Sequence, residues 1–190
     1  MTTDEIKQAV LDYASKYGID PNIALAQIYQ ESHFNPNAVS PAGAKGVAQF
    51  IDTTARAYGI TDPFNVDQSL EAWGQLMSGL LYQFNGRYDI ALAAYNSGPN
   101  RQEYANAAAQ GRAINWAIMP PGVQGETQKY VSDILAMAPQ MGAPSGDTVA
   151  SANGGGNGSG DGGGIDLGSA LPIGVVVAVA AVALVVLTRD

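Results

Sequence analysis

Residues 20–50 read DPNIALAQIYQESHFNPNAVSPAGAKGVAQF, and the fold and function inferred for the rest of the chain depend on this stretch. Asp20 and Pro21 are favoured at the N-cap and the first position of a helix, so the mainly apolar residues after them predict a helix through about Ser32. A single carboxylate, Glu31, stands near the C-terminal end of this predicted helix.

Glu31 occupies position i+7 relative to Ala24 and i+3 relative to Ile28, so its carboxyl group shares an apolar stripe of the helix. Partial burial and the negative end of the helix dipole both disfavour the charged form of a carboxyl group. We therefore expect Glu31 to be protonated near neutral pH, as a general acid must be. The alternative, from position alone, is a glutamate that frays into solvent at a helix end.

Three further stretches carry apolar residues spaced three and four apart, which is typical of helices with one buried face. They begin at Thr2, which fits a capping box with Glu5, at Asp67 as an N-cap, and at Glu126. The first stretch ends at Gly18. The apolar residues are Ile6, Ala9, Val10, Tyr13, Ala14 and Tyr17; Leu70, Trp73, Met77, Leu80, Leu81 and Phe84; and Tyr130, Val131, Ile134 and Leu135. No run alternates at a period of two, so the sequence predicts a mainly α-helical domain over residues 1–141, with Trp73 in its core.

The composition excludes several classes of function. The chain has 190 residues, with 9 Lys and Arg against 17 Asp and Glu and a net charge of -8, which argues against nucleic acid as a partner. Cysteine is absent, which removes disulfides and thiolate zinc sites. The single histidine, His33, is expected at the surface or in a cleft, so we expect neither a metal nor a cofactor.

The C-terminal part differs sharply from the domain. Residues 142–166 contain ten of the 23 glycines and almost no large apolar side chain, which is typical of a disordered, flexible linker. Residues 167–188 carry no charge, and 22 residues at about 1.5 Å each span about 33 Å as a helix, enough for a bilayer core of about 30 Å. The sequence therefore predicts a C-terminal transmembrane helix; the alternative is a buried core helix, which seldom follows such a linker.

The stretch from Glu31 to Phe50 resembles the catalytic segment of family 1 lytic transglycosylases, the soluble-lytic-transglycosylase type of lysozyme-like fold. The resemblance rests on motifs that occur in the family's order and covers roughly residues 5–138. These motifs are Glu31-Ser32, Asn35-Pro36, Ser40-Pro41-Ala42-Gly43-Ala44, Gly46-Val47-Ala48-Gln49, Ala94-Tyr95-Asn96 with Gly98-Pro99, and Glu126-Thr127 with Tyr130-Val131. The Leu-Met pair of the fourth family motif is Val47-Ala48 here and is followed by Phe50-Ile51, which puts in doubt how a flanking sugar or peptide stem is accommodated.

The resemblance implies cleavage of the β-1,4 bond between MurNAc and GlcNAc in peptidoglycan. Glu31 would protonate the leaving oxygen and then act as base, while the MurNAc 6-hydroxyl closes a 1,6-anhydro ring with help from the substrate's N-acetyl group. Ser40 and Gln49 would hydrogen-bond the sugars or the N-acetyl group. Tyr95 and Asn96 would line the cleft near Glu31, and Glu126 would help orient that network. The full implied substrate-binding set is Ser40, Gln49, Tyr95, Asn96, Glu126 and Tyr130. Taken singly, such residues also serve turns, solvated helix faces and cores.

Two rival functions stay open at this point. A goose-type lysozyme would hydrolyse the same bond with a second carboxylate, for which Asp52 is the nearest candidate in sequence. Asp52 precedes Thr53-Thr54 as a plausible helix cap, however, which would turn its oxygens toward backbone amides and favour anhydro products. The second rival is a structural module that binds peptidoglycan without cleaving it.

The predicted anchor bears on the biological setting. The first ten residues lack the pattern of a secretory signal peptide, so a C-terminal anchor alone would leave the domain on the cytoplasmic side. A bacteriophage with an internal membrane could use such an enzyme to open the wall while its genome enters the cell. We therefore expect a virion membrane protein with peptidoglycan strands, the bilayer and virion membrane or vertex proteins as partners; the alternative is a cellular secretion or conjugation enzyme.

Overall fold

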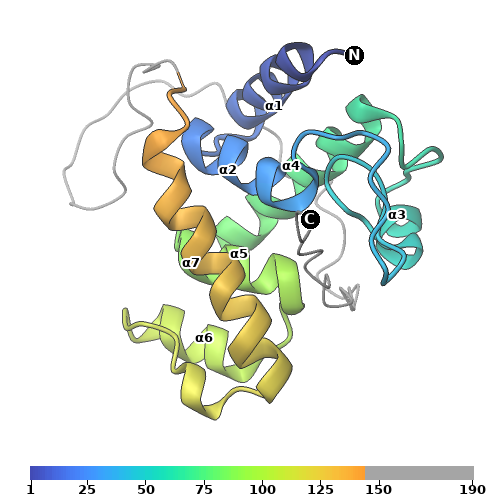
Figure 1. The fold of residues 1–190 in the computed structure, drawn as a ribbon. Coiled ribbons are helices and arrows are strands. Elements are labelled where there is room, and N and C mark those ends of the chain that lie inside the picture. Colours follow the sequence, from blue (N-terminus) through green and yellow to red (C-terminus); the bar gives the residue numbers. More distant parts are fainter. Residues whose placement is uncertain (144–190) are drawn as a thin grey trace, which may run out of the picture.

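The computed structural model of the chain describes residues 1–143, which form a mainly helical domain (Figure 1). Within these residues there is no β-strand, and only isolated antiparallel β-bridges join Lys45 to Val39 and to Phe50. The helices are α1 (Thr3–Tyr17), α2 (Pro21–Ser32), α3 (Asp52–Ala57), α4 (Val66–Gln83), α5 (Tyr88–Ser97), α6 (Gln102–Ala109) and α7 (Gln128–Met137), with the short helices η1 (Trp116–Ile118), η2 (Val123–Thr127) and η3 (Ala138–Gln140). The predicted mainly α-helical class is confirmed.

The first two helices begin and end as their sequences predict. The Thr2 backbone N–H donates to Glu5 Oε2 at 2.6 Å and the Glu5 N–H donates to Thr2 Oγ1 at 3.3 Å, which completes the capping box. Asp20 accepts hydrogen bonds from the first amides of α2, with Pro21 at the first position. Helix α2 ends at His33, whose φ is 54°, so the chain turns sharply two residues after Glu31.

Helix α5 lies at the centre of the domain. Its residues Ile90–Asn96 are all buried, as expected of a helix that is surrounded on every side. Helices α4 and α7 both pack on α5, while α2 packs on α1 and α7. Figure 1 shows α7 crossing in front of α5, with α6 at the bottom and α3 on the right-hand side. Trp73 is fully buried in α4, which confirms its predicted place in the core.

Several predicted boundaries were wrong. Helix α4 is capped by Asn65, whose side chain accepts from the Gln68 N–H at 3.0 Å, so Asp67 lies inside the first turn. Glu126 does not open the last helix: it lies in η2, a turn of π-helix that runs directly into α7. Asp52 is the first residue of α3 and not its cap, since Ile51 occupies the N-cap position without a side-chain bond.

The described part of the chain ends close to the predicted domain boundary. Met141 packs against the core, and the Ala143 backbone N–H donates to Asn22 Oδ1 at 3.1 Å. Among residues 1–143 no helix is long and apolar enough to cross a membrane. The predicted transmembrane segment, residues 167–188, and nearly all of the predicted linker, residues 142–166, lie outside the described residues.

Candidate active site

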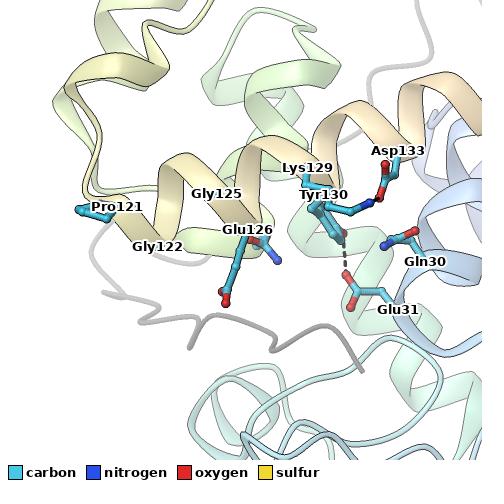
Figure 2. A pocket seen from close by; sticks show the side chains of 10 residues that line it. Gln30, Glu31, Pro121, Gly122, Gly125, Glu126, Lys129, Tyr130 and Asp133 are labelled. Carbon is cyan, nitrogen blue, oxygen red and sulfur yellow. Dashed lines mark hydrogen bonds and ion pairs between the residues drawn. The ribbon is translucent and has the colours of Figure 1, made fainter. Parts of the chain in front are cut away.

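A cavity of about 400 Å³ opens between α2, α5, η2 and α7 (Figure 2). Four residues that the sequence places in the site line it together: Glu31, Asn96, Glu126 and Tyr130. Figure 2 shows Glu31 facing Tyr130, with the side chain of Glu126 extending to the same side of α7 as the Glu31 carboxyl group. The remaining lining residues are Gln30, Pro121, Gly122, Gly125, Lys129 and Asp133.

Glu31 is only 8% exposed, in contrast to a glutamate frayed into solvent. The Tyr130 hydroxyl donates to Glu31 Oε1 at 2.6 Å, while Oε2 is buried and makes no hydrogen bond within the protein. Burial raises the pKa of Glu31 to about 8, against the smaller opposing effect of the Tyr130 hydrogen bond. The carboxyl group is therefore mostly protonated at neutral pH, which is the state that a proton donor needs.

Two buried residues behind Tyr130 complete a chain of hydrogen bonds that ends at Glu31. Gln27 Nε2 donates to the Tyr130 hydroxyl oxygen at 3.2 Å, and Trp73 Nε1 donates to Gln27 Oε1 at 3.0 Å. Gln27 was not predicted as a site residue. The available signal is its place one turn before Glu31, as a polar side chain within a mainly apolar helix.

The Ala94-Tyr95-Asn96 motif joins three parts of the molecule. Asn96 lines the cavity, and its Oδ1 accepts from the Thr127 hydroxyl at 2.7 Å, which links α5 to η2. The buried Tyr95 hydroxyl donates to the Ala48 carbonyl at 2.8 Å and its ring packs on Phe50. Tyr95 does not line the cavity itself; it fastens the 38–50 loop to α5 beside Glu31.

Ser40 and Gln49 lie in the 38–50 loop and also stand outside the set that lines the cavity. Ser40 Oγ accepts from the Ala44 N–H at 3.0 Å, and Gln49 Nε2 donates to the Gly46 and Ala38 carbonyls at 2.8 and 3.2 Å. Both side chains therefore hold the loop in shape, and their bonds to sugar stay a prediction.

Asp52 is not among the residues that line this cavity. Its side chain is 61% exposed and accepts from Lys45 Nζ at 2.7 Å, and this ion pair lowers the pKa of Asp52. The expectation that its oxygens cap a helix was wrong, because Lys45 holds the carboxylate instead. Among residues 1–143 no three His, Asp or Glu side chains are grouped to hold a metal ion.

Comparison with known proteins gives the family. Residues 8–118, more than half of the chain, match the transglycosylase SLT domain. The chain is 38% identical over 91 residues to a membrane-bound lytic murein transglycosylase F of Desulfosudis oleivorans, covering 45% of this chain and 20% of that protein. It is 34% identical over 116 residues to the membrane-bound lytic murein transglycosylase D of Escherichia coli K12, covering 57% and 25%.

The fold also resembles a solved structure, that of the 70 kDa soluble lytic transglycosylase of Escherichia coli. The likeness has a TM-score of 0.56 at 24% identity and covers 70% of this chain and 23% of that one. The chain thus spans between a fifth and a quarter of the length of these relatives. The predicted family and its lysozyme-like fold are confirmed, and the chain belongs to the transglycosylase SLT domain family.

Proposed function

We propose that this chain cleaves peptidoglycan as a lytic transglycosylase, breaking the β-1,4 bond between MurNAc and GlcNAc. The observation that carries this proposal is the Glu31 carboxyl group, buried at the cavity, hydrogen-bonded by Tyr130 and with its pKa raised to about 8. A proton donor with this pKa suits the protonation of a glycosidic oxygen near neutral pH. The relatives named lytic murein transglycosylases support the same substrate.

The first step is proton transfer from Glu31 to the oxygen that leaves with GlcNAc. Positive charge develops at the MurNAc anomeric carbon as the bond breaks, and the substrate's N-acetyl group stabilises it. Glu31, now a carboxylate, takes the proton of the MurNAc 6-hydroxyl as that oxygen closes the 1,6-anhydro ring. One carboxyl group thus serves as acid and then as base.

The surroundings of Glu31 favour ring closure over attack by water. An inverting hydrolase needs a second carboxylate about 6.5 to 9.5 Å from the acid to activate water. The candidate proposed from sequence, Asp52, does not line the cavity and is paired with Lys45. Asp133 lines the cavity but accepts from Lys129 Nζ at 2.6 Å. The remaining carboxylate of the cavity wall, Glu126, has the orienting role that the family resemblance implies. The 6-hydroxyl belongs to the same molecule and has a high effective concentration.

The other site residues have proposed roles that follow from their positions. Asn96 and Glu126 line the cavity, and in this proposal they hydrogen-bond the sugar rings or the N-acetyl group. The loop wall beside the substrate would be shaped by Ser40, Gln49 and Tyr95. These side chains would bind the substrate through the donors and acceptors that their bonds to the loop leave unused.

The test is product analysis on purified peptidoglycan. Mass spectrometry separates the outcomes because each anhydro product is lighter by one water than its hydrolysed counterpart. We expect 1,6-anhydromuropeptides from the wild-type chain and none from Glu31→Gln. Reducing-end muropeptides would mean hydrolysis, and intact peptidoglycan after incubation with the wild-type chain would leave only a binding module.

The cellular setting is a separate proposal that rests on the sequence. We propose that residues 167–188 anchor the domain in a bilayer and that residues 142–166 tether it, supported by the charge-free run of 22 residues. The setting we favour is the virion membrane of a membrane-containing bacteriophage, where the enzyme would open the wall. Detection of the chain in purified virions tests this, and its recovery only from envelopes of uninfected cells would contradict it.

A further inference from the structure

Four buried side chains from three helices form one continuous chain of hydrogen bonds. Trp73 of α4 donates to Gln27 of α2, Gln27 donates to Tyr130 of α7, and Tyr130 donates to Glu31 at the end of α2. The heavy-atom distances are 3.0, 3.2 and 2.6 Å in that order. Trp73 and Gln27 are fully buried, so neither has water as a ready alternative partner.

Trp73, at the start of this series of hydrogen bonds, fixes the donor and the acceptor in each bond that follows. An indole N–H can only donate, so the Gln27 carbonyl must face Trp73 and the Gln27 amide nitrogen must face Tyr130. The Tyr130 oxygen then accepts from Gln27, and its single proton is left to point at Glu31. Gln27 Nε2 also donates to Met77 Sδ, a weak acceptor 3.6 Å away, so a reversed amide would lose contacts on both sides.

This direction decides which oxygen of Glu31 carries the acidic proton. Oε1 accepts the hydrogen bond of the Tyr130 hydroxyl, and the acid's proton on Oε1 would make that oxygen a poorer acceptor than the carbonyl oxygen of a neutral carboxyl group. The proton of the neutral acid therefore belongs on Oε2, which makes no hydrogen bond within the protein. Figure 2 shows this oxygen pointing away from Tyr130.

We propose that Gln27 and Trp73 are positioning residues that act through Tyr130 to keep the Glu31 proton on Oε2, the oxygen that delivers it to the glycosidic bond. This inference rests on the proposed function, in which Glu31 is the acid. It assigns a use to a buried glutamine whose burial is otherwise unfavourable in an apolar core, since a buried polar group is tolerated only when it is hydrogen-bonded.

The test measures the ionisation of Glu31 directly. The titratable groups around Glu31 are Tyr130 and Tyr95, with Glu126, Lys129 and Asp133 on the cavity wall. All are kept in the variant Gln27→Met, which removes the donor to Tyr130 and the acceptor of Trp73. The carboxyl ¹³C signal of Glu31, assigned by its loss in Glu31→Gln, is followed through a pH titration, and muropeptide release is followed in parallel.

In Gln27→Met the Tyr130 hydroxyl is free to turn and accept a hydrogen bond from the neutral acid. We therefore expect the pKa of Glu31 to rise above its wild-type value, because the neutral form gains a partner. We also expect the plateau rate to fall about fivefold, since the proton can now rest on Oε1, held there by a single hydrogen bond. The matched control is Met77→Leu, which disturbs the same buried spot while the donor chain stays whole, and both readouts should keep their wild-type values.

A folded Gln27→Met variant with wild-type pKa and wild-type rate overturns the inference. If Gln27→Met does not fold, Trp73→Phe frees the Gln27 amide to reverse, and the same two readouts decide. Activity retained in Glu31→Gln would refute the proposed function alone, because the pKa titration of Glu31 in the wild-type chain and Gln27→Met still reports on the donor chain.

Discussion

At the scale of single residues, the pKa of Glu31 sets the pH range in which the proposed acid can donate its proton. Burial raises it to about 8 and the Tyr130 hydroxyl lowers it, so the protonated acid is abundant up to mildly alkaline pH. We predict that kcat/KM falls on the alkaline side with an apparent pKa of about 8. In Tyr130→Phe the alkaline limb of this pH profile should move to higher pH, because the Glu31 carboxylate loses its hydrogen-bond donor and the pKa of Glu31 rises. A wild-type limb near pH 5, measured by muropeptide release across pH, would contradict the burial argument.

The same carboxyl group should destabilise the domain. The folded state holds the Glu31 proton up to about pH 8, whereas the unfolded chain releases it near its ordinary value of 4.5. Stability is therefore full below about pH 4.5 and falls as pH rises from there to about 8. At about 1.4 kcal/mol for each pKa unit, the loss at pH 7 reaches about 3 kcal/mol.

Glu31→Gln is neutral at every pH and can still accept from Tyr130, so it escapes this loss. We predict that it melts higher than the wild type at pH 7 and at the same temperature at pH 4, while activity drops at least about 100-fold. Thermal melts at the two pH values check this. Equal melting temperatures at pH 7 would show that the carboxyl group is not held neutral by the fold.

Residue identity could be predicted only where a pattern or a motif marked it. Glu31 stands out because a carboxylate on an apolar stripe is unusual, and its burial follows from that stripe. Gln27 lies on the same helix, yet its partners are 46 and 103 positions away in the sequence, and no local pattern announces them. The prediction that Asp52 caps a helix was wrong for a different reason: its partner Lys45 is near in sequence, but their contact depends on the shape of the loop between them.

At the scale of elements, the loop between α2 and α3 depends on two left-handed glycines that differ in their surroundings. Gly46 has φ 76° and lies so close to Pro63 that an added Cβ would overlap the Pro63 carbonyl. Gly43 has φ 82°, with open space where its Cβ would be. Both positions penalise a side chain through φ alone, by about 1 to 2 kcal/mol.

We therefore predict that Gly46→Ala lowers the melting temperature clearly more than Gly43→Ala, because it adds a clash with backbone to the same strain in φ. Activity should fall with it, since Gln49 and Tyr95 both hold this loop beside Glu31. Thermal melts of the two variants side by side are the measurement. Equal losses of stability would mean that Pro63 moves aside at little cost.

Helix boundaries were predicted well where a cap is local and poorly where the tertiary structure chooses among candidates. The start of α1 is fixed by the capping box of Thr2 and Glu5, and the start of α2 by Asp20 and Pro21. Each signal lies within four consecutive residues. At the start of α4, Asn65 and Asp67 are both good caps, and the selection of Asn65 depends on the chain path that precedes it. Helices α3 and α6 have only 6 and 8 residues, and α5 is buried on every side, so none gives the long two-faced pattern that marks a helix in sequence.

At the scale of the whole molecule, α2 and α7 pack against each other and bring together the acid and its hydrogen-bond donor from distant parts of the sequence. Glu31 and Tyr130 are 99 positions apart and meet at 2.6 Å. The family match ends at residue 118, so the helix that supplies Tyr130 lies beyond it. A fragment that stopped at the matched region would lack the cavity wall of η2 and α7.

The shortest fragment that keeps the site should therefore end after Ala143, whose N–H closes the structure onto Asn22. We predict that residues 1–143 fold, melt cooperatively and release anhydromuropeptides at the rate of the full chain, because the hydrogen bonds that link Glu31 to Tyr130, Gln27 and Trp73 all lie within them. A second fragment that ends at Ile118 is the control and should be inactive, since it lacks Tyr130.

The full chain should float with lipid vesicles while the fragment of residues 1–143 stays at the bottom of the gradient, because only the full chain carries the charge-free run of residues 167–188. Co-flotation of the short fragment would place the lipid contact in the domain itself, and its failure to fold would mean that later residues complete the core.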